Sequence, residues 1–222
     1  MINTLDDYIS CSMPQWGDFA TNLNLRKKVD ERGNLLPFLG NTVVFLLDDE
    51  TKESLRQLQE SLYRAAPEML AKPLQMPTFH MTLHDLANGT PEQPGLQDYM
   101  RYTQERVSQI LPGWKDAPPI RMKTTWLFNM VNTSIVLGLK PADGESWCRL
   151  DEMYTTLEDV VRLGYALTPH ITMAYFLPGT YNPEQVQRLT AALRNVELEI
   201  NLDMKNLVLQ NFMNMNHYET VL

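Results

Sequence analysis

The stretches TFHMTLHDL (78–86) and TPHITMAYF (168–176) each place a Thr, a His and a second Thr at alternate positions. The chain has only four His residues, and two of them, His80 and His170, lie in this shared pattern 90 residues apart. The Thr that follows each His by two positions keeps the same separation. Repetition at a fixed distance indicates two similar structural units within one chain.

The repeat extends beyond these stretches, because apolar periodicity predicts the same order of strand, helix, His-containing strand, helix and strand in both halves. The predicted helices are 49–70, 96–111, 146–164 and 183–195, and the other predicted strands are 42–48, 120–130, 133–141, 196–203 and 207–215. This order predicts an α+β domain of two pseudo-symmetric halves, about 41–130 and 131–222, with helices outside and two sheets facing inward. Residues 1–40 are irregular, which predicts an extension that wraps the domain. We expect the basic residues of RKKVDERGN (26–34) to be solvated.

The composition is that of a globular protein with 44% hydrophobic residues, a formal net charge of −8 and a pI near 5.0. The acidic balance weighs against a surface for long nucleic acids, but a local pocket can still hold a small nucleotide or a short oligonucleotide. No apolar run is long enough for a membrane span, and the acidic N-terminus does not resemble a secretory signal. Cys11 and Cys148 are expected to be reduced thiols in a cytoplasmic protein, and we expect a monomer.

Side-chain alternation gives each His-containing strand an apolar face and a polar face. His80, Thr82 and His84 share the polar face of the first copy, and His170 and Thr172 share that of the second. A single His on a strand is usually structural, but the same pattern in two halves favours a catalytic role. Two imidazoles across a groove can accept and donate protons near neutral pH, and the hydroxyls can donate hydrogen bonds to phosphate oxygens.

A metal site is the main rival for these residues. On a strand His80 and His84 would lie about 13 Å apart at ~3.3 Å per residue, which is too far to share an ion. No carboxylate or Cys cluster has ligand spacing, so we expect no metal and no cofactor. His84 has no equivalent in the second copy, where Ala174 stands, and it is predicted to lie at the groove edge, in contact with either substrate or solvent.

The paired motifs HMT (80–82) and HIT (170–172) resemble those of the LigT-like two-histidine phosphoesterase superfamily, whose mark is two H-x-[ST] motifs. The resemblance covers roughly residues 42–220. It implies a bilobal fold with antiparallel sheets facing a central cleft. It also implies an acid–base role for His80 and His170 and a phosphate-holding role for the hydroxyls of Thr82 and Thr172, with the two His roles unassigned.

Further substrate-binding candidates follow from strand parity. Phe176 has the parity of His170, so it either stacks on a base or packs in the core. Arg121 and Lys123 share one face of their strand and contact either phosphate or solvent. Tyr218, near the C-terminus, is a candidate for closing the cleft.

The function expected from these observations is metal-independent hydrolysis of a 2′,3′-cyclic phosphate or a short oligonucleotide phosphodiester. Two alternatives stay open: a 2′-5′ or cyclic-oligonucleotide phosphodiesterase acting on signalling nucleotides, and a binding module without turnover. Loss of one His or Thr would favour the binding module, but all four residues are present.

Overall fold

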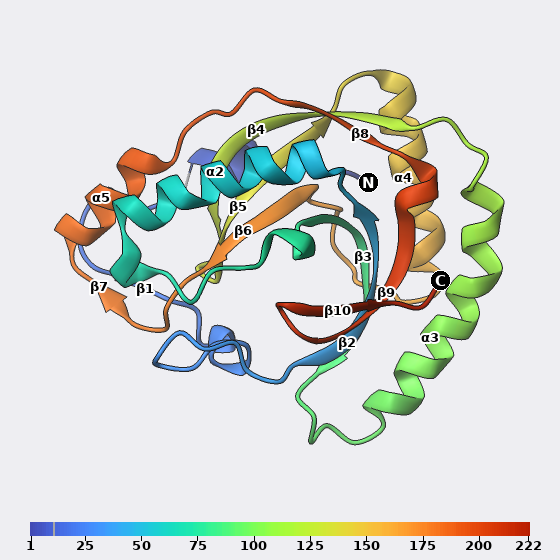
Figure 1. Cartoon of the computed structure of the whole chain (residues 1–222), viewed down its shortest axis with the longest axis horizontal. Helices are drawn as coiled ribbons and strands as arrows, with labels where there is room; N and C mark the ends of the chain where they lie inside the picture. Colours follow the sequence, from blue (N-terminus) through green and yellow to red (C-terminus); the bar gives the residue numbers. More distant parts are fainter. Residues whose placement is uncertain (11) are drawn as a thin grey trace.

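The computed structural model describes residues 1–10 and 12–222, and two four-stranded antiparallel sheets form its frame (Figure 1). The first sheet has the strand order β10-β9-β2-β3 and the second has the order β6-β5-β4-β8. The bounds of the first sheet are β2 Leu39–Leu46, β3 His80–Gly89, β9 Leu207–Asn214 and β10 His217–Thr220. Those of the second are β4 Ile120–Met130, β5 Ser134–Pro141, β6 His170–Tyr175 and β8 Glu199–Leu202. The His-containing strands β3 and β6 are therefore the edge strands of the two sheets.

The two sequence repeats do not coincide with the two sheets. Strand β4 ends the first repeat but pairs with β5 of the second, and β9 of the second repeat pairs with β2 of the first. Each half thus exchanges its last strand with the other, which leaves the orders β9-β2-β3 and β4-β5-β6 related by the repeat. The exchange joins the halves through backbone hydrogen bonds as well as side-chain packing.

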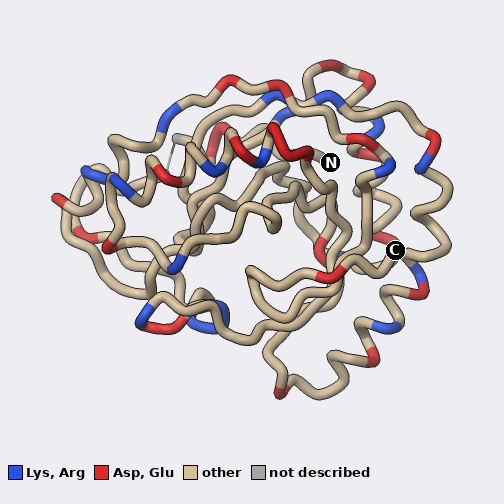
Figure 2. The backbone as a smooth tube through the Cα atoms, viewed as in Figure 1, with Lys and Arg blue, Asp and Glu red and all other residues tan. Residues whose placement is uncertain are grey.

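Four long helices lie outside the sheets, where their apolar faces can be covered. They are α2 Asp49–Ala65, α3 Leu96–Ile110, α4 Gly144–Glu158 and α5 Pro183–Ala192. Figure 1 shows α3 and α5 on opposite outer sides. The side chains of Asp48, Asp143 and Asn182 accept hydrogen bonds from backbone N–H groups at the starts of α2, α4 and α5. Acidic and basic residues alternate along the outer helices (Figure 2).

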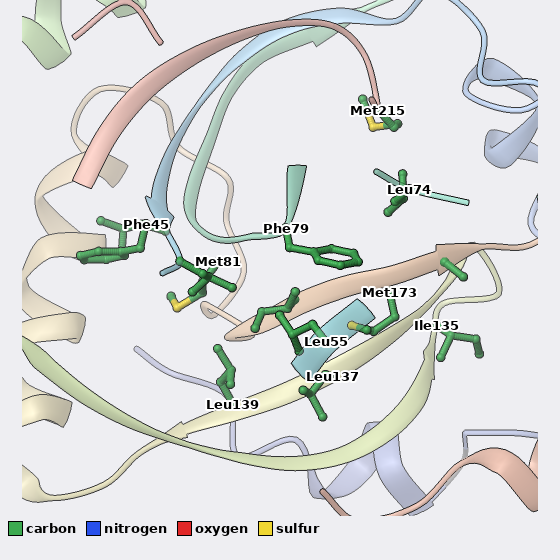
Figure 3. Close-up of a cluster of buried hydrophobic side chains, with 14 of the residues drawn as sticks. Phe45, Leu55, Leu74, Phe79, Met81, Ile135, Leu137, Leu139, Met173 and Met215 are labelled. Atoms are coloured by element: carbon green, nitrogen blue, oxygen red, sulfur yellow. The ribbon is translucent and has the colours of Figure 1, made fainter. Parts of the chain in front are cut away.

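The apolar faces of the His-containing strands meet in the main core. Met81 on β3, Met173 on β6 and Leu55 on α2 are all fully buried there (Figure 3). The amide of Gln59 on α2 donates to the carbonyl of Met173, which ties the helix to β6 beneath the motif. Packing of α2 against β6 holds the second motif from behind.

The N-terminal extension is built into both sheets instead of lying over a finished domain. Leu5 packs with Phe128 and Val136 in a small buried cluster. The extension then forms β1 (Phe19–Ala20), which pairs with β7 (Thr180–Tyr181), and a short 3₁₀ helix at Leu23–Lys27. The amide of Phe38 donates to the carbonyl of Met213 on the first sheet. The extension therefore bridges the two halves.

Several predicted boundaries were wrong. The helix predicted over 49–70 ends at Ala65, and the one predicted over 146–164 ends at Glu158. The strand predicted over 196–203 shortens to four residues. Strands β1, β7 and β10 were not predicted, because elements of two to four residues have no readable periodicity.

Two remaining expectations concern Cys residues and membrane spans. Cys148 is an exposed free thiol, and Cys11 lies outside the described residues. Among residues 1–10 and 12–222, no helix combines the length and the apolar character that crossing a bilayer requires.

Candidate active site

A cavity of about 570 Å³ lies where the edge strands β3 and β6 meet, and both motifs face it. His80 and Thr82 line it from β3, and His170 and Thr172 line it from β6. The predicted polar groove is thus present, and the repeat places equivalent residues on both of its sides. Its volume lies within the range typical of small-ligand pockets.

The tautomer of each motif His is set by a backbone carbonyl two residues earlier. Nδ1 of His170 lies 2.6 Å from the carbonyl oxygen of Thr168, and His80 has the equivalent hydrogen bond to Thr78. A carbonyl can only accept, so Nδ1 carries the proton in both rings. In the neutral form each Nε2 therefore holds a lone pair that can accept a proton from a ligand.

Shielding from water lowers the pKa of both motif imidazoles, because burial disfavours the charged form. The pKa of His80 falls from 6.5 to about 4, and the neighbouring His170 contributes to that fall. The hydrogen bonds to Thr78 and Thr168 and the negative charge of Asp85 act in the opposite direction. Without a ligand, both rings are therefore neutral near pH 7.

The hydroxyls of Thr82 and Thr172 have no hydrogen-bond partner within the part of the chain that the structure describes. Both side chains are half-buried in the wall of the cavity. Each hydroxyl is therefore available to donate to a ligand oxygen.

A bulge interrupts each motif strand at the same position of the repeat. On β3, Thr82 and His84 pair with the consecutive residues Val44 and Val43, which leaves Leu83 as the extra residue. On β6, Thr172 and Ala174 pair with consecutive residues of β5 in the same way, which leaves Met173 as the extra residue. A bulge reverses the facing of every side chain after it.

The bulges overturn two sequence predictions that assumed regular strands. Phe176 is fully buried in the core, with its ring centroid 4.9 Å from that of Phe19, and Tyr175 lines the cavity in its place. On β3 the same reversal turns Asp85 towards the cavity, where it is the only carboxylate among the described lining residues. Only a signal for the bulges themselves, which the sequence lacks, could have identified Asp85 and Tyr175.

His84 is not a solvent-facing residue of the groove edge. Its side chain is 0% exposed, and it reaches the cavity wall beside Tyr154. Nδ1 lies 2.5 Å from the carbonyl oxygen of Asp85, and Nε2 lies 3.2 Å from the carboxylate of Glu158. Glu158 also accepts from the amide of Leu163, so this cluster fastens the segment after α4 to the bulge in β3.

The placement of Arg121 and Lys123 in the groove was wrong. Both lie where β4 pairs with β8, away from the cavity. Arg121 pairs with Asp143 at 2.7 Å, and Lys123 lies 3.7 Å from Glu199. Tyr218 does line the cavity, and its ring meets that of His80 edge-on with centroids 5.1 Å apart.

One cation in the cavity wall was not predicted. Lys28 comes from the N-terminal extension, whose basic residues were expected to be solvated, and it lines the cavity beside Phe38 and Tyr175. In the described part of the chain, no three His, Cys, Asp or Glu residues gather closely enough to hold a metal ion.

Comparison with known proteins rests on structure alone, because no family model and no curated protein sequence matches the chain. The structure is similar to that of ATU0111 from Agrobacterium tumefaciens str. C58, a conserved protein of unknown function, with a TM-score of 0.64 and 18% identity over 100% of this chain and 99% of that one. It is also similar to TT0787 from Thermus thermophilus, a two-histidine phosphoesterase superfamily member, with a TM-score of 0.50 and 15% identity over 82% and 95% of the two chains.

The chain has a LigT-like α+β fold. The fold that the paired motifs implied is thereby confirmed. E. coli LigT in its apo form aligns with a TM-score of 0.47 and 15% identity over 84% of this chain and 96% of LigT. Likeness at these identities establishes the fold, so the chemistry of the LigT-like cavity has to be argued from its own residues.

Proposed function

We propose that the protein is a phosphodiesterase that opens a 2′,3′-cyclic phosphate or cleaves a short oligonucleotide phosphodiester by His acid–base catalysis. The observation that carries this proposal is the matched pair in the cavity. His80 and His170 both present Nε2 with Nδ1 held by a backbone carbonyl, and each is followed by an unpartnered Thr hydroxyl. The cavity volume suits a mononucleotide or a short oligonucleotide.

The proposed reaction on a cyclic phosphate needs one proton taken and one proton given. The neutral imidazole accepts a proton from water through Nε2 while the water oxygen forms a bond to phosphorus. The bond from phosphorus to one ribose oxygen breaks, and the protonated Nε2 of the second imidazole donates its proton to that oxygen. The product is a ribose monophosphate with one free hydroxyl; the motif resemblance implies a 2′-phosphate. His80 and His170 can each take either role.

Binding of the substrate supplies the charge that the pair lacks in the free protein. Burial keeps the pKa of both imidazoles low, so neither is protonated near pH 7 in the empty cavity. A phosphodiester anion within hydrogen-bond distance favours the imidazolium form and raises that pKa. The hydroxyls of Thr82 and Thr172 would then donate to the non-bridging oxygens and hold phosphorus between the rings.

The test is hydrolysis of the four 2′,3′-cyclic nucleotides and a 2′-5′ diadenylate in excess EDTA, followed by phosphorus NMR. His80→Ala and His170→Ala should each lower kcat/KM by about 10²-fold or more, as expected for a removed acid–base group. His217→Ala is the matched control, because His217 is 54% exposed and pairs only with Glu219 on the surface. Its activity should equal that of the wild type.

Each possible result decides between the functions. Turnover of the diadenylate alone would support a 2′-5′ phosphodiesterase. Binding of every nucleotide without product would support a binding module and overturn the enzymatic proposal. Full activity in either motif variant would remove the His pair from the reaction.

A further inference from the structure

Lys28 is the only Lys or Arg among the described residues that line the cavity. The N-terminal extension brings it there, from outside the two repeats that supply the His and Thr residues. Its side chain is half-buried. A cation in that position without a counter-charge loses hydration and gains little in return, which marks it as a group awaiting an anion.

The backbone at Lys28 is held rigidly. Its amide donates to the carbonyl of Leu25 at 2.8 Å, and its carbonyl accepts from the amide of Leu36 at 2.8 Å. The next residue, Val29, is fully buried and bridges to Leu35. Because the backbone is fixed, a ligand that meets this ammonium group loses little free energy in ordering the chain around it.

Two aromatic rings fix the side chain in turn. Nζ of Lys28 lies 4.9 Å from the ring centroid of Phe38 and 5.8 Å from that of Tyr175. Cation–π contacts of this kind stabilise a position without neutralising the charge. No carboxylate among the described residues forms an ion pair with Lys28. The full positive charge therefore stays available to a ligand.

The position of Lys28 differs from that of the reacting phosphate. The reacting phosphate belongs between His80 and His170, whereas Lys28 lies at the ring of Tyr175, five residues after His170 on β6 and thus up to roughly 15 Å along the backbone. The equivalent position of the first repeat holds Asp85, which is negative. The two ends of a pseudo-symmetric cavity thus have opposite charge.

We propose that Lys28 binds a second anionic group of the substrate, a phosphate additional to the one that reacts. This inference rests on the proposed function and names its substrate class: a nucleotide phosphodiester with a further phosphate, such as a 5′-terminal one. Asp85 at the other end accepts hydrogen bonds from ribose hydroxyls or base amino groups and repels phosphate. The charge difference gives the substrate one orientation in an otherwise symmetric site.

The activity test compares adenosine 2′,3′-cyclic phosphate with the same nucleotide carrying a 5′-phosphate. The wild type should prefer the 5′-phosphorylated substrate in kcat/KM by about tenfold or more, the size expected of a charge-assisted contact. Lys28→Gln should abolish that preference, and Lys28→Arg should restore part of it. Lys27→Gln is the matched control, since Lys27 is exposed, does not line the cavity and should keep the wild-type preference.

A binding measurement separates this inference from the proposed reaction. Calorimetry with adenosine 3′,5′-bisphosphate and adenosine 3′-monophosphate requires no turnover. Tighter binding of the bisphosphate by the wild type and by Lys27→Gln, but not by Lys28→Gln, would support Lys28 even if no cyclic nucleotide were hydrolysed. Equal affinity of the wild type for the two nucleotides, or equal losses in the Lys27 and Lys28 variants, would overturn it even if hydrolysis were found.

Discussion

Asp85 and Tyr175 occupy equivalent positions of the two repeats, 90 residues apart, and both face the cavity because a bulge precedes each of them. The extra residues at the bulges, Leu83 and Met173, are themselves equivalent. The repeat therefore extends to an irregularity of the backbone as well as to the motif. The chemical difference between a carboxylate and a phenol at matching sites makes a symmetric scaffold asymmetric in function.

Asp85→Asn is expected to move the pH profile of kcat/KM to lower pH. The charge of Asp85 raises the pKa of both His80 and His170, so its removal lowers both values and makes the protonated imidazole scarcer near pH 7. Activity at pH 7 should fall and recover in part as the pH is lowered. Initial rates from about pH 4.5 to 8 measure this, with the exposed Asp98→Asn on α3 as the control. A profile that superimposes on that of the wild type would refute the electrostatic role.

The free energy of unfolding should decrease as the pH falls from about 6.5 towards 4. His80 has a pKa of 6.5 when unfolded and about 4 in the fold, so the unfolded chain binds the proton first and gains stability on acidification. The contribution is fully present above pH 6.5 and is lost on the way down to the folded pKa. Urea unfolding at several pH values measures the slope.

The slope can be assigned with one substitution. His80→Gln removes the titrating group and should flatten the dependence in this pH window, whereas the exposed His217→Gln should leave it as in the wild type. Identical slopes in all three proteins would show that other groups cause the acid sensitivity.

Thr82→Val and Thr172→Val should lower activity and leave stability nearly unchanged. Each variant removes one donor to the phosphate, which costs about 10- to 100-fold in kcat/KM for a charge-assisted hydrogen bond. Neither hydroxyl has a partner within the described protein, so no internal hydrogen bond is lost. Kinetics and thermal unfolding are measured together, and Thr180→Val on the exposed side of β7 serves as the control. Unimpaired turnover in both motif variants would contradict the phosphate-holding role.

Phe176→Ala and Tyr175→Ala should separate stability from activity. Phe176 is fully buried against Phe19, and truncation of a buried Phe costs about 3–5 kcal/mol. Tyr175 is half-buried in the cavity wall, so its truncation should change nucleotide affinity more than the free energy of unfolding. Urea titrations and calorimetry with adenosine 3′-monophosphate give the two quantities. A larger stability loss for Tyr175→Ala would mean that the strand after Met173 is not reversed in solution.

The sequence was sufficient to predict the motif residues and the α+β class. Strand alternation and helical periodicity depend on neighbouring residues, so the polar face of His80 and Thr82 and the apolar helix α2 could be read directly. Matching spacing in the second half then predicted the pair across a groove. The exchange of β4 and β9 between the sheets was beyond such patterns, because strand order depends on which distant backbone groups pair.

The sequence by itself therefore determined which side chains of the repeat carry the chemistry, since covalent spacing and side-chain alternation are local. Only the tertiary structure decided that Asp85 and Tyr175 face the cavity while Phe176 does not, because the bulges exist only in register with β2 and β5. It also decided that Lys28 enters the site. The extension reaches the cavity by pairing β1 with β7 and joining Phe38 to β9, contacts across more than a hundred residues that no local pattern encodes.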